Sequence, residues 1–204
     1  MRTCSLVALA LAILTMPTIA VAQATTSAAL VHAEGDVFLN ERIVEPGAPS
    51  AILPETAVVR TSRGRAVIAL KRGGFLFLDD GASVSVHGNG VYNFNRIEVL
   101  TGSAIVASET SAPLVQCESE IRLSDAGVFR FDVQLVSAGK PCRIRVFEGA
   151  AAVPLVTVVN ALRAGQAMSC DRRCGDMIPT TDFSRDQLDD FDRWAAQMVG
   201  RLKK

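Results

Sequence analysis

The feature that most constrains this chain is a long succession of short apolar runs separated by glycine, proline and asparagine. Residues 83–86 show the pattern in its simplest form, because apolar and polar side chains alternate along them as in a strand with one buried face. The runs follow one another without a crossover helix, which excludes a doubly wound α/β sheet. The sequence therefore predicts an all-β fold, either an antiparallel sandwich or a β-solenoid-like stack.

The expected strands are short and regularly spaced. They lie at residues 36–39, 42–44, 57–61, 65–70, 75–78, 83–86, 96–100, 103–107, 114–117, 120–123, 128–133 and 142–147. We expect a tight hairpin turn at residues 40–41 and a second turn at residues 62–64, where polar residues and a glycine interrupt the apolar pattern.

A weak internal repeat indicates how successive strands are joined. Residues 98–106 resemble residues 145–153, because in each the apolar residues lead to a glycine, Gly102 or Gly149, and resume beyond it. A glycine at this position suits a chain that turns between two sheets. Similar hairpin chemistry arising independently would give the same likeness, so both explanations stay open here.

The N-terminus has the pattern of a secretory signal peptide. Arg2 precedes an apolar run at residues 6–14, and a small-x-small cleavage site follows at residues 20–22. A membrane anchor would need roughly 20 unbroken apolar residues, and Pro17 and its neighbours interrupt the run earlier. We expect residues 1–22 to be removed, residues 23–29 to form a flexible leader, and the mature chain to be periplasmic or secreted without a transmembrane segment.

The charge balance argues against a polyanionic partner. The chain carries 21 basic and 21 acidic residues, and loss of Arg2 with the signal peptide would leave a net charge of −1. Such a chain has no general attraction to nucleic acid or anionic lipid. Basic residues between 60 and 72 alternate with apolar ones, as expected on the solvent side of strands.

Four cysteines remain after signal removal, and an even number in an exported chain favours disulfides. We predict links between Cys117 and Cys142, which lie in neighbouring expected strands, and between Cys170 and Cys174, which flank a short polar turn. A zinc site is the alternative, but a Cys-x3-Cys pair without a nearby histidine has few ligands to offer.

The C-terminal region has a different pattern, with a linker at residues 171–183 and an amphipathic helix at residues 184–204. Ser184 is the expected N-cap, with Gln187 at the spacing of a capping box. Apolar residues then recur at helical spacing, at positions 188, 191, 195, 198 and 202. We expect this stripe to dock on the sheet, while contact with a partner or a membrane surface is the alternative.

Taken in order, these strands and turns resemble a FecR domain across residues 33–168. The resemblance rests on residues 35–40, 46–47, 58–66, 73–78, 100–104, 127–133, 146–150 and 164–166. Residues 189–194 also resemble the tail that often follows such domains. The resemblance implies a β-rich domain, at residues 30–170, that recognises a partner outside the cytoplasm. It implies neither iron sensing nor sigma-factor control, because the cytoplasmic and membrane-spanning segments of FecR proteins have no counterpart here.

The sequence offers few candidates for catalysis. His32 and His87 accompany no nucleophile motif and no second histidine at metal-ligand spacing. The acidic pairs Asp79-Asp80 and Asp189-Asp190 are adjacent in sequence, and sequence alone cannot place them across a cleft. We therefore expect no catalytic, cofactor-binding or metal-binding residues, and a non-enzymatic protein.

Three functions remain as hypotheses. The first is an interaction module of the cell envelope, acting in sensing or signalling, that binds an envelope protein through a sheet edge or face. The second is a peptidoglycan- or polysaccharide-binding protein. The third is a hydrolase that uses Asp79 and Asp80.

Overall fold

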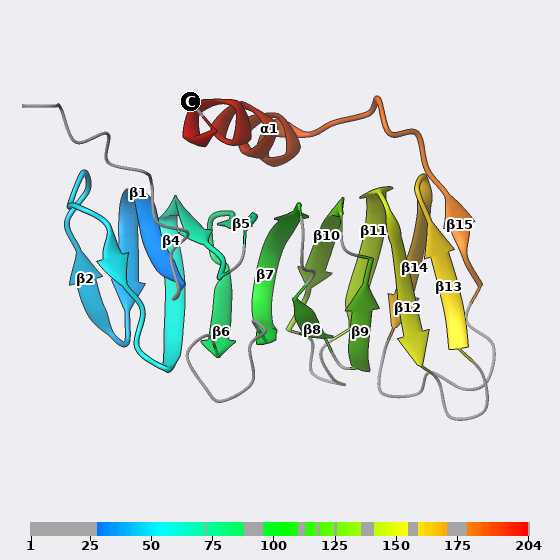
Figure 1. The fold of residues 1–204 in the computed structure, drawn as a ribbon, viewed down its shortest axis with the longest axis horizontal. Helices are drawn as coiled ribbons and strands as arrows, with labels where there is room; N and C mark the ends of the chain where they lie inside the picture. The colour runs from blue at the N-terminus through cyan, green and yellow to red at the C-terminus, as the bar shows by residue number, and fades with distance from the viewer. Residues whose placement is uncertain are drawn as a thin grey trace, which may run out of the picture.

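A computed structural model describes residues 28–71, 73–87, 96–109, 113–117, 119–124, 126–135, 141–154, 159–170 and 179–203. The predicted signal peptide at residues 1–22 and Cys174 lie outside the described residues. Within these ranges the protein is an all-β structure with a C-terminal helix. Figure 1 shows the strands following one another along the long axis, with the helix lying across one side of them.

The elements have the following bounds. They are β1 (Ala29–Leu39), β2 (Arg42–Val44), β3 (Ala51–Ile52), β4 (Thr56–Ala69), β5 (Phe75–Leu78), β6 (Ser83–His87), β7 (Arg96–Ser108), β8 (Leu114–Cys117), β9 (Ser119–Leu123), β10 (Gly127–Val133), β11 (Cys142–Glu148), β12 (Ala150–Pro154), β13 (Val159–Arg163), β14 (Gln166–Cys170), β15 (Thr181–Asp182) and α1 (Asp190–Leu202).

Two long strands each belong to two layers of the sheet. The N-terminal parts of β4 and β7 pair with β6, and their C-terminal parts pair with β5. We call the N-terminal parts, with β6, β8, β9, β12 and β13, the first layer. The C-terminal parts, with β5, β10, β11, β14 and β15, form the second layer. The strand β1 follows β4 through both layers, and among the described pairs only β7 and β8 run parallel.

The long strands bend between the layers at glycines that no larger residue could replace. A Cβ on Gly64 would lie 2.0 Å from the carbonyl oxygen of Glu34, and one on Gly102 would lie 2.5 Å from the Cα of Ala82. Gly102 also has a φ of 78°, which disfavours side chains. These contacts let neighbouring corners stack closely along the molecule.

The internal repeat corresponds to two of these corners. Gly102 lies between the two layers within β7, and Gly149, with a φ of 84°, separates β11 in the second layer from β12 in the first. The prediction that these glycines mark passages between two sheets is confirmed.

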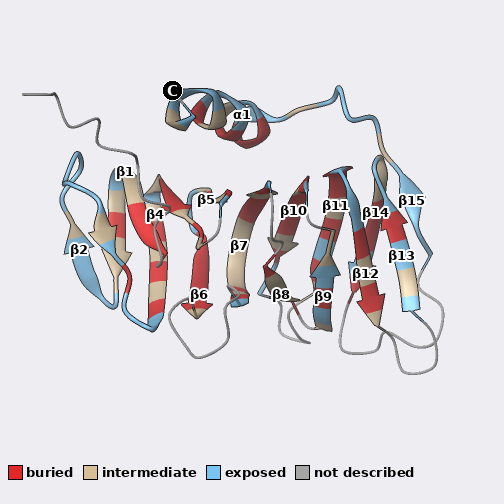
Figure 2. Cartoon of the chain, viewed as in Figure 1, coloured by how far each residue is buried: buried red, intermediate tan, exposed pale blue. Residues whose placement is uncertain are grey.

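The main core lies between the two layers. One continuous cluster contains Val84 and Ile97 of the first layer together with Leu76 and Phe131 of the second, all fully buried. Figure 2 shows this burial as bands along the strands. Because alternate residues of each strand point into the cluster, the two-residue period of the sequence is explained by packing between two layers.

A disulfide also joins the layers. Cys117 of β8, in the first layer, is bonded to Cys142 of β11, in the second. Cys170 of β14 is a buried free thiol directly opposite Cys142 in the strand register. Its predicted partner, Cys174, lies outside the described residues.

Several predicted boundaries were wrong. The expected turn at residues 62–64 is a corner within β4, because β1 pairs with β4 on both sides of it, while β6 pairs with β4 before it and β5 after it. Ala28 and Ala29, assigned to a flexible leader, are buried at 1% and 5% exposure and lead into β1. The predicted linker at residues 171–183 contains β15, which pairs with β14.

The helix begins later than the sequence predicted. Its N-cap is Asp189 rather than Ser184, and a reciprocal capping box joins Asp189 to Asp192. Ser184 instead accepts a single backbone hydrogen bond from Gln187. Aspartate is as good an N-cap as serine, and Asp189 also has a partner on the sheet, described below, that fixes where the helix starts.

Candidate functional site

The outer face of the second layer carries a second, smaller apolar cluster. Val67, Phe77 and Ile105 alternate with core residues along β4, β5 and β7, so their side chains point away from the main core. Phe191, Ala195 and Met198 of α1 pack against them at 2–3% exposure. The prediction that the apolar stripe of the helix docks on the sheet is confirmed, and in Figure 2 the buried side of α1 faces the strands.

Trp194 reinforces this contact at the edge of the helix. Its ring meets Phe77 edge-on at 5.9 Å between centroids, and the guanidinium of Arg65 lies 5.2 Å from its centre. Arg65 is held in place by Asp79, with 2.9 Å between Nε and Oδ1. Because Trp194 is the only tryptophan in the chain, its fluorescence will report on the docking of α1.

A buried ion-pair network attaches the N-terminal end of α1 to β10. Arg130 Nη1 donates to Asp189 Oδ2 at 2.6 Å and to Asp192 Oδ1 at 2.7 Å, and its Nε donates to Asp132 at 2.8 Å. The side chains of Arg130 and Asp192 are only 8% and 3% exposed. Such a pair contributes mainly to specificity of docking, because its desolvation offsets much of the attraction, but loss of one partner leaves a buried charge.

The network changes the protonation of its members. Burial alone would lower the pKa of Arg130, but the charge of Asp132 and hydrogen bonds to three carboxylates outweigh it, so the net pKa is raised. Burial likewise favours the neutral form of Asp189, yet the hydrogen bonds from the Asp192 amide and from Arg130 bring its pKa below the ordinary 3.8. The ionised network is therefore the stable form near neutral pH.

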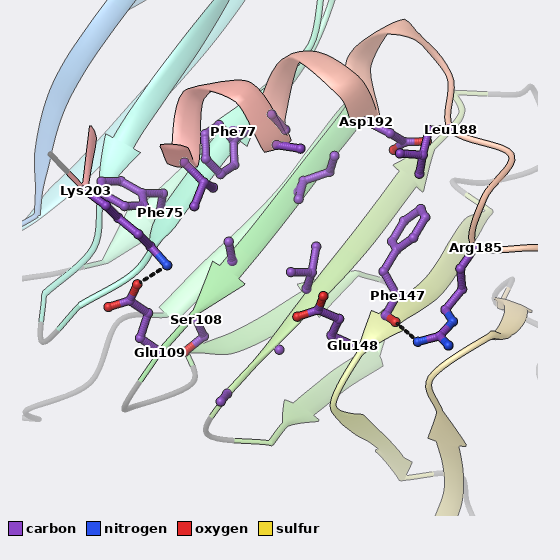
Figure 3. Close-up of a pocket in the computed structure, with 18 of the residues that line it drawn as sticks. Phe75, Phe77, Ser108, Glu109, Phe147, Glu148, Arg185, Leu188, Asp192 and Lys203 are labelled. Carbon is purple, nitrogen blue, oxygen red and sulfur yellow. Dashed lines mark hydrogen bonds and ion pairs between the residues drawn. The ribbon is translucent and has the colours of Figure 1, made fainter. Parts of the chain in front are cut away.

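Two further contacts hold α1 and the segment before it. Lys203 Nζ lies 2.5 Å from Glu109 Oε1 at the C-terminal end of the helix. Arg185 Nη1 donates to the carbonyl oxygen of Phe147 at 3.3 Å. Figure 3 shows these contacts on opposite sides of an open space below the helix.

That space is a groove of about 820 Å³ between α1 and the second layer. Its floor is mainly apolar, with Phe75, Val128 and Phe147 among its lining residues. Glu148 and Asp186 lie on its rim, both exposed, and neither has an ion-pair partner among the described residues. The groove therefore combines an apolar surface with two unpaired carboxylates, which suits binding more than catalysis.

The predicted histidine candidates lie elsewhere. His32 Nε2 is 2.7 Å from Glu34 Oε1, and His87 contacts the hydroxyls of Thr56 and Ser85. Neither lines the groove. These three hydrogen bonds are typical of histidines that have a structural role on strands.

The acidic pairs have structural partners as well. Asp79 pairs with Arg65, and Asp80 Oδ1 accepts from the Arg63 amide at 2.5 Å. Asp189 caps α1, while Asp190 pairs with Arg193 within the helix. Neither pair faces a second carboxylate across the groove.

Within the residues that the structure covers, no three histidine, cysteine, aspartate or glutamate side chains gather as metal ligands would. In the same ranges no helix combines the length and apolarity needed to cross a membrane.

Sequence reasoning missed the residues that attach α1. Arg130 and Asp132 alternate with the core residues Phe129 and Phe131, so the two-residue period could have placed them on the outer face. The link from Arg130 to Asp192, 62 residues later in the chain, has no sequence signal, because it depends on where α1 packs.

Comparison with known proteins gives a likeness in fold. No protein-family model matches the chain, and no curated protein matches it either. Two crystal structures from Parabacteroides distasonis, at 2.50 and 1.65 Å resolution, are similar, and each is described as a "putative anti-sigma factor". Their TM-scores are 0.53 and 0.51, both at 14% identity, and the matches cover 65% and 70% of this chain. The matched region spans 62% and 65% of those proteins, less than two thirds of their length.

Proposed function

We propose that this chain is an exported, non-enzymatic, FecR-like module of bacterial envelope signalling that binds a partner protein in the groove beneath α1. The order of FecR-like motifs in the sequence supports the family, and FecR proteins act on sigma factors. The similar structures are described as anti-sigma factors, which agrees with that assignment. The disulfide between Cys117 and Cys142 suits an oxidising compartment.

The observation that carries the proposal is the groove itself. Its apolar floor offers contact area, and the unpaired carboxylates of Glu148 and Asp186 outnumber the one guanidinium, Arg185, that lines the groove without a carboxylate partner among the described residues. A matching occupant is a segment of an envelope protein that carries apolar side chains and a lysine or arginine. Such a segment would bury the floor and pair with the rim carboxylates.

The test is site-specific photo-crosslinking in intact cells. A photoreactive amino acid at Ala196, an exposed helix position that lines the groove, is compared with one at Ile52, which is 74% exposed on the edge strand β3 and does not line the groove. We expect a discrete protein adduct from position 196 and none of the same mass from position 52.

Variants that remove the rim carboxylates test whether the adduct depends on the groove. Combining Glu148→Gln with Asp186→Asn should reduce the adduct several-fold, while the matched control Glu55→Gln, an exposed carboxylate away from the groove, should leave it unchanged. Adducts with glycan instead of protein would favour the polysaccharide-binding alternative. Equal adducts at both positions, or no effect of the rim variants, would contradict the proposal.

A further inference from the structure

A second hollow, of about 520 Å³, lies on the outer face of the second layer, where β10 and β11 run side by side. It shares Arg130 and Asp132 with the network that attaches α1, but none of its charged residues lines the groove beneath the helix. The lining includes Arg130, Asp132, Arg143 and Arg145. Three arginines and one carboxylate therefore line this hollow, and Arg130 is already paired with Asp189 and Asp192 of the helix segment as well.

The strand register concentrates this positive charge. Arg130 lies directly opposite Arg145, and Asp132 directly opposite Arg143. Like charges at directly opposite positions destabilise a sheet unless something compensates them. Asp132 compensates in part, since it accepts from Arg130 Nε at 2.8 Å and from Arg145 Nη2 at 3.2 Å.

Two donors in the hollow are left over. Arg145 Nε is buried and has no hydrogen-bond partner among the described residues. Arg143 is exposed, and within the same residues it forms no ion pair, although Asp132 lies opposite it in the register. A buried donor without an acceptor is rare in folded proteins and calls for an explanation.

Two serine hydroxyls also line the hollow, and only one of them donates to Asp132. Ser103 Oγ donates to Asp132 at 2.7 Å, which adds a third donor to that carboxylate. Ser169, exposed and opposite Arg143 across β11 and β14, lines the hollow as a further donor. Asp132 thus accepts three hydrogen bonds, two at Oδ1 and one at Oδ2, while Arg143, Arg145 and Ser169 still have donors that it does not engage.

We propose that this hollow binds an oxyanion, a phosphate or carboxylate group, through Arg143 and Arg145. The planar guanidinium presents pairs of N–H donors that match the oxygens of both groups. The anion would accept from Arg143 and from the Arg145 donors that Asp132 leaves over. It would supply a negative charge to these two arginines of β11, whereas Arg130 of β10 already has Asp189 and Asp192. This site does not depend on the groove beneath α1, and it would add a ligand-dependent function to a partner-binding module.

Isothermal titration calorimetry on the mature chain tests the proposal. Inorganic phosphate and succinate are titrated separately at constant ionic strength, so that the two oxyanion chemistries are distinguished. We expect saturable binding of at least one of them. Arg143→Gln should weaken that binding roughly tenfold or more, because it removes charge-assisted hydrogen bonds, and the exposed position of Arg143 should leave folding intact.

The matched control is Arg42→Gln, which removes one exposed positive charge from β2 at the other end of the sheet. If this control weakens binding as much as Arg143→Gln does, the anion responds to net charge and the site is refuted. Absence of saturable binding for both anions refutes it as well. Near-UV circular dichroism of each variant confirms that the fold is retained in the comparison.

Discussion

The two faces of the second layer are built from the same strands but are organised by different forces. On β10 the inward residues Phe129 and Phe131 are fully buried in the main core. The outward residues Arg130 and Asp132 form ion pairs instead. The inner face is a continuous apolar contact, whereas the outer face combines a small apolar cluster, an ion-pair network and two hollows.

The inner face therefore determines the stability of the fold, whereas the outer face provides the surfaces available for binding. Close packing between the layers contributes most of the buried apolar area and tolerates little change. The outer face is covered by one helix held at a few polar contacts. We therefore expect changes at the inner contact to alter global stability, and changes at the outer contact to affect mainly the docking of α1.

The largest effect should come from breaking the covalent link across the inner contact. Replacing Cys117 and Cys142 together with serine opens a loop with a sequence separation of 25. In the chain-entropy description this should lower the free energy of unfolding by about 3.5 kcal/mol. Urea denaturation followed by circular dichroism measures it. Dithiothreitol should destabilise the natural chain and leave the double variant unchanged; equal sensitivity of both would contradict the assignment.

A slightly smaller and more local effect should follow Arg130→Ala at the outer contact. The substitution leaves the carboxylate of Asp192, 3% exposed, without its partner. Removing one member of a buried pair costs about 3 kcal/mol, and here α1 can avoid that cost by leaving the sheet. We expect a red shift of Trp194 fluorescence with little change in the strand signal.

Arg193→Ala is the matched control for that experiment. It also removes an arginine that pairs with an aspartate, but Arg193 is 55% exposed and its partner Asp190 lies on the same helix. Exposed ion pairs of this kind contribute little to the free energy of unfolding. If both variants released Trp194 equally, the network around Arg130 would not be what holds α1.

The smallest expected effect is a change in the docking of α1 at low pH. The pKa of Asp189 is lowered on docking, so its contribution is complete above the ordinary value of 3.8 and is lost as the pH falls through the lower, folded value. Arg130, with its raised pKa, stays charged throughout. Trp194 fluorescence should therefore change on acidification below pH 3.8, before the strand signal is lost. Asp189→Asn, which can still cap the helix, should make this change shallower, and Asp190→Asn should not.

The sequence predicted the inner contact better than the outer one, for a physical reason. Packing between layers requires alternate apolar residues, and that period is visible in each strand, as in residues 128–133. The glycine corners were also visible, because Gly102 and Gly149 interrupt two similar stretches. The turn expected at residues 62–64 was wrong, because a local glycine signal does not tell a hairpin from a corner inside one long strand.

The outer contact depends on residues that are distant in the sequence. The start of α1 was misplaced because Ser184 and Asp189 are equally good caps, and only the ion pair with Arg130 decides between them. The two hollows were not predicted, since each is formed where separate elements meet. The pairing of Cys117 with Cys142 agrees with the structure. The expected reason was wrong, because β8 and β11 are not neighbouring strands but belong to different layers.

The passage of β1, β4 and β7 through both layers has a mechanical consequence. In the N-terminal half, continuous hydrogen-bonded strands connect the layers, so pulling them apart would require many bonds to break together. In the C-terminal half no described strand runs through both layers, and the described links between them are the corner at Gly149, the turn at Gly165 between β13 and β14, and the bond between Cys117 and Cys142. Tension applied across the molecule would therefore open it from the C-terminal end, and a reducing environment would weaken that end selectively.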